Sequence, residues 1–287
     1  MHTKPPLSHR GQEPENGVLY LVGTPIGNLN DISARALNIL KKVSLIACED
    51  TRQTSKVLQK FAIKNILISF NKNNSYEKIP KLICDLKSGK SIALVSDAGM
   101  PGICDPGEDL VKNAKNKGVE IICIPGPCAA ITALVTSGMP SSSFIFEGFL
   151  PKKKKEREKT ILEISKSSKT IILYESPHRL LKLLNELKEY CGEDREIQVS
   201  RELTKRFEQH IKSDINDVIK YFESREIIGE FTIILKGKKK VKETQLNPVL
   251  IKKDLDELIN AGLSLSAASK YLAKKNNLIK SQIYNLY

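Results

Sequence analysis

From residue 18 onward, short apolar runs alternate with amphipathic stretches. The runs are rich in β-branched residues and predict strands at 18–22, 43–48, 66–70, 92–95 and 119–124. Runs without polar interruption are typical of strands buried on both faces of a sheet. Between them, apolar residues recur three or four positions apart, as in Ile79, Leu82, Ile83 and Leu86, which predicts helices. Five such strand–helix units predict a largely parallel sheet.

Beyond residue 150 the pattern changes to a second set of strands and helices. A basic linker leads to strands at 170–174, 196–200 and 230–235 and to helices at about 177–190 and 214–222. A second charged linker precedes three short predicted helices within 248–287. The predicted fold class is therefore α/β, with two α/β domains and a small C-terminal helical module. The predicted parts are a loose tail (1–17), the two α/β domains (18–150 and 151–240) and the helical module (245–287).

Turns rich in proline and glycine follow three of the predicted strands. They read VGTPIGN at 22–28, DAGMPGICDPG at 97–107 and PGPCAA at 125–130. Parallel-sheet proteins keep their ligand crevice at the carboxyl ends of the strands. Proline stiffens such a turn, whereas glycine lets the backbone approach a ligand closely. These turns predict a rigid cleft, and the function is expected there.

The composition of the 287 residues is that of an ordinary soluble globular protein, with 40% apolar and 28% charged residues. The longest uncharged stretch, 121–146, contains the proline pair of the third turn, so no membrane helix is expected. Six cysteines occur without a C-x-x-C pair. They are interpreted as reduced, mostly buried thiols of a cytoplasmic protein.

Net charge is +13, and the two halves of the chain share it unequally. Residues 1–150 carry 17 basic and 13 acidic side chains, an excess of +4, and residues 151–287 carry 29 and 20, an excess of +9. This imbalance favours a polyanionic partner, of which nucleic acid is the commonest. The alternative is a lysine-rich surface that is merely well solvated.

Several common enzyme motifs are missing from the sequence. It contains no Gly-x-Gly triplet, which excludes the usual dinucleotide-binding fingerprint, and no Gly-x-Ser-x-Gly elbow of a serine hydrolase. The four histidines are scattered and no cysteine spacing suits tetrahedral zinc, so no metal is expected.

Six short motifs follow one another along the chain. They are LVGTPIGNL at 21–29, CEDTR at 48–52, SDAGMPGICDPG at 96–107, PGP at 125–127, EGFLP at 147–151 and YESPHR at 174–179. Together they resemble the ribosomal RNA small-subunit methyltransferase I family, a branch of the tetrapyrrole-methylase superfamily of S-adenosylmethionine enzymes. The resemblance covers roughly residues 17–287.

The resemblance implies 2'-O-methylation of the ribose of a cytidine in the decoding region of 16S rRNA. It also implies a cytoplasmic homodimer whose S-adenosylmethionine lies in a cleft between two α/β domains, with 16S rRNA or the small ribosomal subunit as partner. Two alternatives stay open: a small-molecule methylase of the same superfamily that acts on a corrin precursor, and an RNA-binding protein without catalysis.

Carried onto this sequence, the resemblance assigns cofactor-binding residues to the edges of the cleft. One set is Asp97, Ala98, Gly99, Ile103, Ala129, Ala130, Phe149 and Leu150, and the opposite wall is Gly23, Pro25 and Gly27. An acidic group directly after a strand, such as Asp97, can accept hydrogen bonds from the ligand's amino-acid or ribose donors. For Ile103, Ala129 and Ala130 the alternative is plain helix packing. Glu202 and Thr204 are further candidates in the second domain.

Methyl transfer from a sulfonium is an in-line displacement, so the alignment of the reacting atoms supplies much of the rate. A ribose hydroxyl is nevertheless a poor nucleophile at neutral pH, and a general base contributes about a hundredfold or more. Glu49 and Asp50 are the predicted candidates for this general base, with Arg52 placed to hold a phosphate. The alternative for these three is a capped turn with a surface ion pair.

Two groups of basic residues are candidates for RNA binding. Lys152, Lys153, Lys154, Lys155 and Arg157 directly follow the predicted cofactor edge and would line the rim of the cleft. Lys270, Lys274 and Lys275 lie in the helical module, which resembles a helix-turn-helix appendage. The alternatives are a solvated lysine loop and a small packing module.

Overall fold

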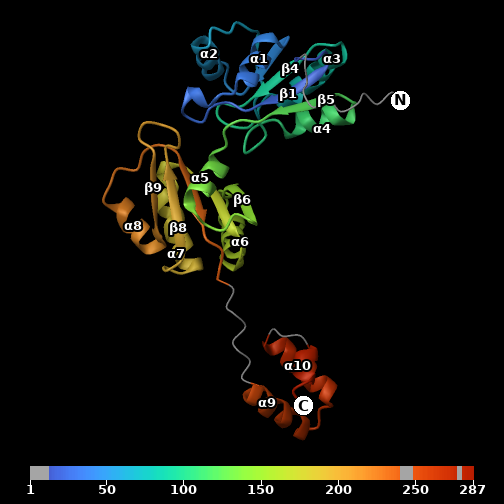
Figure 1. Cartoon of the computed structure of the whole chain (residues 1–287), viewed down its shortest axis with the longest axis vertical. Coiled ribbons are helices and arrows are strands. Elements are labelled where there is room, and N and C mark those ends of the chain that lie inside the picture. Colours follow the sequence, from blue (N-terminus) through green and yellow to red (C-terminus); the bar gives the residue numbers. More distant parts are fainter. Residues whose placement is uncertain (1–12, 240–247, 277–279) are drawn as a thin grey trace. The chain divides into compact units, whose positions relative to one another are not determined.

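The computed structural model describes residues 13–239, 248–276 and 280–287 (Figure 1). Residues 1–12 of the predicted loose tail (1–17) lie outside the described residues, as does the charged linker from residue 240 onward. The chain divides into two compact units, Met1–Lys238 and Lys239–Tyr287. The first is called the large unit and the second the helical unit.

A five-stranded parallel sheet forms the first half of the large unit. Its strands are β1 (Val18–Val22), β2 (Leu45–Cys48), β3 (Leu67–Ser69), β4 (Ile92–Val95) and β5 (Glu120–Ile124). They run in the order β3-β2-β4-β1-β5, and all four neighbouring pairs are parallel. The five predicted strands and the parallel sheet are thus confirmed. Their carboxyl ends lie at one edge of the sheet and carry the three turns rich in proline and glycine.

Helices cover both faces of this first sheet. One core cluster joins α1 (Ala34–Lys42) and α2 (Thr51–Lys60) to one face, and a second joins α3 (Ser75–Lys87) and α4 (Glu108–Asn116) to the other. Side chains of Ser33 and Asp50 cap the first two helices by accepting hydrogen bonds from backbone N–H groups of the first turn. Burial on both faces explains why these strands read as unbroken apolar runs.

A second five-stranded sheet forms the other half of the large unit. Its strands are β6 (Phe144–Phe149), β7 (Thr170–Glu175), β8 (Glu196–Arg201), β9 (Gln209–Asp214) and β10 (Phe231–Leu235). The order is β6-β7-β10-β8-β9, with β6 parallel to β7 and the remaining pairs antiparallel. One face packs on α6 (Lys154–Lys166), α7 (Leu180–Cys191) and α8 (Ile215–Glu223).

Helix α5 (Ala129–Ser137) covers the opposite face of the second sheet. Its Ala130, Ala133 and Leu134 share a core cluster with Ile172 of β7 and Ile234 of β10. Strand β6 also belongs to this sheet. The domain boundary predicted at residue 150 is therefore too late in the chain, because residues 129–149 pack with the second sheet. The chain crosses between the two domains in the short segment between β5 and α5.

The described residues of the helical unit form three helices, as predicted. They are α9 (Pro248–Asn260), α10 (Leu265–Asn276) and α11 (Lys280–Tyr284), and Gly262 lies between the first two. Its own small core contains Leu255, Leu272 and Ile283. Tyr271 on α10 lies outside this core and is exposed.

The prediction that most cysteines are buried is wrong. All six are free thiols, but only Cys48 is buried, while Cys84, Cys104 and Cys123 are exposed. Cys104 is exposed because it lies in a turn, and Cys123 is exposed because its position on β5 faces outward. Over the described ranges, no helix is long and apolar enough to cross a bilayer, and no three His, Cys, Asp or Glu side chains form a metal-binding group.

Candidate functional site

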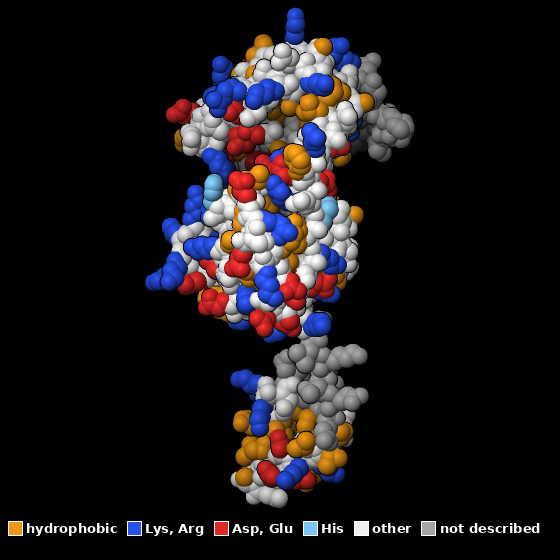
Figure 2. All heavy atoms as spheres, turned by 90° about the vertical axis from the view of Figure 1, so that its left-hand side faces the viewer, with side chains coloured by type: hydrophobic (Ala, Val, Ile, Leu, Met, Phe, Trp, Pro, Cys, Tyr) orange, Lys and Arg blue, Asp and Glu red, His pale blue; other side chains and the backbone are white. Residues whose placement is uncertain are grey.

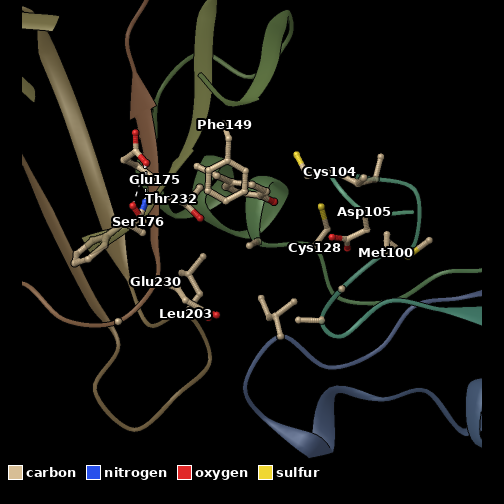
Figure 3. A pocket seen from close by; sticks show the side chains of 18 of the residues that line it. Met100, Cys104, Asp105, Cys128, Phe149, Glu175, Ser176, Leu203, Glu230 and Thr232 are labelled. Atoms are coloured by element: carbon tan, nitrogen blue, oxygen red, sulfur yellow. Dashed lines mark hydrogen bonds between the residues drawn. The ribbon is translucent and has the colours of Figure 1, made fainter. Parts of the chain in front are cut away.

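A pocket of about 370 Å³ lies where the two α/β domains of the large unit meet (Figure 3). The first domain supplies Ile26 and the turn that contains Ala98–Asp105. Cys128 and Ala129 lie at the start of α5, where the chain enters the second domain. The second domain supplies Phe149, the segment 174–177, Leu203 and the segment 229–232. Pockets of this size take small-molecule ligands and cofactors.

The ionisable lining of the pocket is acidic. Asp105, Glu175 and Glu230 line it, and no lysine or arginine does among the described residues. Figure 2 shows acidic side chains gathered where the two α/β domains meet. The remaining wall is mostly apolar, with Ile103 and Phe149 exposed. Such a pocket suits a ligand that is cationic and partly apolar.

Five of the predicted cofactor residues line this pocket: Ala98, Gly99, Ile103, Ala129 and Phe149. The other six predicted residues do not line it, although all belong to segments that shape it: Gly23, Pro25, Gly27, Asp97, Ala130 and Leu150. The turn after β4 and the start of α5 are thus brought together as the sequence predicts.

Two of these residues, Gly23 and Gly27, lie where neighbouring segments come so close that a side chain would not fit. A Cβ atom at Gly23 would lie 2.6 Å from the Cα of Gly126, so the first and third turns touch through their glycines. A Cβ at Gly27 would lie 2.8 Å from Oγ1 of Thr204, in the second domain. Oγ1 of Thr204 also accepts a hydrogen bond from the N–H of Asn28, 3.0 Å away. Both glycines therefore fix the walls rather than line the cavity.

Ala130 and Leu150 are core residues, with 4% and 3% of their surface exposed. The N–H of Ala130 donates a hydrogen bond to the hydroxyl of Tyr174, 3.0 Å away, which ties α5 to the end of β7. Tyr174 lines the pocket, and burial raises the pKa of its hydroxyl. The packing alternative therefore holds for Ala130.

Glu49, Asp97 and Asp105 form an acidic cluster at the carboxyl ends of β2 and β4. Asp97 accepts a hydrogen bond at Oδ1 from the N–H of Asp50, 3.0 Å away. Burial raises the pKa of Asp105, and the nearby Asp97 raises it further, against the opposing effects of Ser96 and Lys72. Burial also raises the pKa of Glu49, and the charges of Asp105 and Asp97 add to that effect.

Asp50 and Arg52 form the capped turn that was the alternative interpretation. Oδ1 of Asp50 accepts a hydrogen bond from the N–H of Arg52 at 2.8 Å, and Oδ2 pairs with the guanidinium at 2.7 Å. These hydrogen bonds lower the pKa of Asp50 to about 2. A carboxylate held in this way is a weak base.

Sequence reasoning missed most of the second-domain wall. Ser176 and Thr232 line the pocket, as do Cys104 and Cys128 (Figure 3). Ser176 lies in the YESPHR motif, but the resemblance assigned it no cofactor contact. No comparable signal marks Thr232, because it is one polar residue in the apolar strand β10.

Arg157 is buried and does not lie on the rim. Its Nε donates a hydrogen bond to Oε2 of Glu186 at 2.8 Å, and its guanidinium lies 3.7 Å from Oε2 of the buried Glu175. This burial argues against Arg157 as a phosphate contact. Lys152 and the three lysines after it are exposed at the start of α6, and Lys153 and Lys154 make loose pairs with Glu156 and Glu158.

The comparison with known families decides the relationship. The model of the tetrapyrrole (corrin/porphyrin) methylases matches residues 18–219, which span both sheets except for β10. The chain belongs to this family. Curated relatives narrow it to the ribosomal RNA small subunit methyltransferase I branch, as the motifs predict.

Two relatives illustrate that branch, and both are named ribosomal RNA small subunit methyltransferase I. The protein from Synechocystis sp. is 42% identical over 94% of this chain and 97% of its own length. The protein from Thermotoga maritima is 46% identical over 77% of this chain and 99% of its own length. Almost all of the Thermotoga protein thus corresponds to 222 aligned residues.

Solved structures of other tetrapyrrole methylases share the fold of the large unit. A cobalt precorrin-4 methyltransferase superposes with a TM-score of 0.59 at 18% identity, over 77% of this chain and 95% of that one. A uroporphyrin-III C-methyltransferase from Thermus thermophilus, solved with S-adenyl homocysteine, gives 0.54 at 15% identity, over 76% and 96%. The predicted cofactor is confirmed for the family, whose members are S-adenosylmethionine-dependent methyltransferases.

Proposed function

We propose that the protein transfers a methyl group from S-adenosylmethionine to the 2'-hydroxyl of a cytidine in the decoding region of 16S rRNA. The observation that carries this proposal is the near-full-length similarity to relatives named for the small-subunit rRNA. It is supported by a pocket between two α/β domains and by a net charge of +13. We further propose a homodimer in the cytoplasm, with 16S rRNA or the small subunit as partner.

The pocket of the large unit fits S-adenosylmethionine in charge and in surface. The cofactor supplies an activated methyl group on a positively charged sulfur. Asp105 provides negative charge, whereas the carboxylate of Glu230 is paired with Lys205. The apolar side chains of Ile103 and Phe149 offer a surface for the adenine ring. Thr232 and Ser176 offer hydroxyl groups as hydrogen-bond partners. Outside the lining, Gly23, Pro25, Gly27 and Asp97 belong to the turns that shape the pocket, and Ala130 and Leu150 pack in the core behind it.

The acidic cluster offers a general base for the ribose hydroxyl. Asp105 lines the pocket, and its raised pKa makes its carboxylate a stronger base than an exposed aspartate. Glu49 lies beside it with a pKa raised in the same direction. Asp50 is less suited, because its pKa is about 2 and Arg52 holds its carboxylate. We therefore assign the base to Asp105, with Glu49 next in line.

This assignment is tested by single-turnover methylation with Asp105→Asn and Glu49→Gln. We expect Asp105→Asn to lower the rate at saturating cofactor about a hundredfold. The affinity for S-adenosylmethionine, measured by calorimetry, shows how much of the effect is binding. If affinity falls while the saturated rate is unchanged, Asp105 binds the cofactor and is not the base.

The lysines at the start of α6 are proposed to hold phosphates of the rRNA. Lys152, Lys153, Lys154 and Lys155 are exposed and lie within six residues of Phe149 in the pocket wall. Replacing all four by serine is expected to flatten the dependence of RNA affinity on salt, because each phosphate contact releases counterions. An unchanged salt dependence would leave them as a solvated surface.

The function as a whole is tested with labelled S-adenosylmethionine. The protein is incubated with naked 16S rRNA or with small subunits that lack the modification, and the labelled nucleotide is mapped. Label on the 2'-oxygen of a decoding-region cytidine is the expected result. Label on another nucleotide corrects the target, and transfer to a corrin precursor but not to RNA favours the small-molecule alternative. Cofactor binding without transfer to either favours an RNA-binding protein without catalysis.

A further inference from the structure

The loop 202–208, between β8 and β9, presents two different faces. Leu203 lies on its inner side, lines the pocket and is buried, with 6% of its surface exposed (Figure 3). Phe207 lies four residues further on and is 64% exposed. We call residues 202–208 the rim loop, since it joins the pocket wall to the outer surface.

The rim loop is held in a conformation that its sequence does not favour. Glu202 and Thr204 have φ angles of +53° and +65°, a left-handed conformation that costs energy for any residue with a side chain. Such strain persists only where surrounding contacts impose it. The rim loop is therefore expected to be rigid.

Contacts at both ends of the rim loop supply this restraint. The side chain of Thr204 binds the N–H of Asn28 in the first domain, and its own N–H donates to Oε2 of Glu208 at 2.7 Å. Nζ of Lys205 pairs with Glu202 at 3.0 Å and with Glu230 at 2.7 Å. These two ion pairs neutralise the charge of Lys205 within the protein.

Arg206 and Phe207 remain on the outer face of this rigid loop. The guanidinium of Arg206 lies 5.5 Å from the centroid of the Phe207 ring, and both residues are exposed. Across the described parts of the chain, Arg206 makes no ion pair. Phe207 belongs to none of the apolar core clusters there. An exposed cation beside an exposed aromatic ring on a rigid loop is a typical platform for an unpaired nucleobase and its phosphate.

The lengths of the relatives also favour RNA contacts within the large unit. The Thermotoga protein, named for the same rRNA activity, aligns over 222 residues with 99% of its length. That length is close to residues 18–238 and leaves no room for a helical unit as well. A protein of about the length of the large unit is thus named for the same rRNA, which favours substrate contacts within the large unit.

We propose that Phe207 stacks on an unpaired base of the RNA substrate next to the target nucleotide, and that Arg206 binds the adjoining phosphate. The inference rests on the proposed function and adds a substrate-positioning role for the rim loop. Leu203 connects the proposed stacking site to the pocket, because the loop that carries Phe207 also forms part of the pocket wall.

The test compares variants in single-turnover methylation of unmodified 16S rRNA or small subunits. Phe207→Ala is expected to raise the KM for RNA about tenfold or more, the effect of losing one stacked base. Phe207→Trp restores it, because a larger ring stacks as well. Arg206→Ala is expected to reduce the slope of log affinity against log salt by about one contact. The affinity for S-adenosylmethionine and the melting temperature stay unchanged in all three.

Tyr76→Ala is the matched control, since Tyr76 is a 90% exposed aromatic residue on α3, outside the rim loop. An unchanged KM in Phe207→Ala, or an equal rise in Tyr76→Ala, overturns the inference. The inference is also overturned if size-exclusion chromatography shows a dimer for the wild type and a monomer for Phe207→Ala. The Phe207 ring would then contact a second copy of the protein and not RNA. If the wild-type protein methylates no RNA, the proposed function fails and the inference with it. If the wild type methylates RNA and Phe207→Ala does so equally well, only the inference fails.

Discussion

At the scale of single residues, the pocket is built from turns that lie far apart in the sequence. The Ala98–Gly99 turn and the start of α5 line the pocket because parallel strands bring their carboxyl ends together. Roles were harder to predict, since Asp50 and Asp105 both follow strands as acidic residues. Only the fold shows that Arg52 neutralises one, while burial raises the pKa of the other.

Asp50 allows the structural and catalytic roles to be separated with two substitutions. Asp50→Asn keeps a side chain that can cap α2, whereas Asp50→Ala removes the cap. We expect the alanine variant to melt at a lower temperature and the asparagine variant to melt close to the wild type. Single-turnover rates of Asp50→Asn should also match the wild type. A large loss of rate in a stably folded Asp50→Asn would restore Asp50 as the base.

At the scale of elements, continuous apolar runs were predicted well and polar edge strands were missed. Strand β9 reads QHIKSD, with one apolar residue, because it lies at the edge of the second sheet and pairs only with β8. Strand β6 is interrupted by a bulge between Phe146 and Gly148. Both escape a search for alternating or continuous apolar residues.

The ion pairs of Arg157 hold α6 against the end of β7 and against α7. Arg157→Ala removes the positive charge that faces the carboxylates of the buried Glu175 and the half-buried Glu186. It is expected to lower the free energy of unfolding by about 3 kcal/mol. Urea denaturation measures it. Lys155→Ala, on the exposed face of the same helix, is the control and should change stability by less than about 0.5 kcal/mol. A loss below about 1 kcal/mol in Arg157→Ala would contradict this reasoning.

Glu196 fastens the far end of β8 by accepting hydrogen bonds from Lys236 and Lys212, at 2.5 and 3.1 Å. These bonds lower the pKa of the carboxyl from its ordinary value of 4.5. The folded state is therefore stabilised above pH 4.5, and this contribution is lost as the pH falls through the lowered pKa. It is expected to be at most about 1 kcal/mol, because the group is partly exposed.

Denaturation of Glu196→Gln and of the wild type across pH 3–7 tests this linkage. The difference in unfolding free energy should be largest at neutral pH and shrink in acid. A difference that stays constant over the whole range would show that charge at Glu196 does not contribute.

At the scale of the whole molecule, the large unit and the helical unit have separate cores. The Thermotoga relative, nearly all of which aligns with 77% of this chain, indicates that a shorter chain suffices for the family's fold. Truncation after Lys238 is expected to leave the melting temperature and the affinity for S-adenosylmethionine unchanged. RNA affinity should fall and depend less on salt, since Lys270, Lys274 and Lys275 are exposed cations.

Full methylation and an unchanged salt dependence in the truncated protein would make the helical unit a packing module. As a control, the full-length protein with Lys270, Lys274 and Lys275 replaced by serine keeps the unit and removes its charge. If only the truncation lowers RNA affinity, the unit acts through shape rather than charge.

Helix α5 has a consequence for how the large unit unfolds. It follows β5, the last strand of the first sheet, but it packs on one face of the second sheet. There the N–H of Ala130 donates a hydrogen bond to the hydroxyl of Tyr174. If either sheet unfolds, the packing of α5 is lost, so the two sheets are expected to unfold together. Scanning calorimetry of the protein truncated after Lys238 should therefore record a single cooperative melting peak, and two resolved peaks would mean that the halves come apart independently.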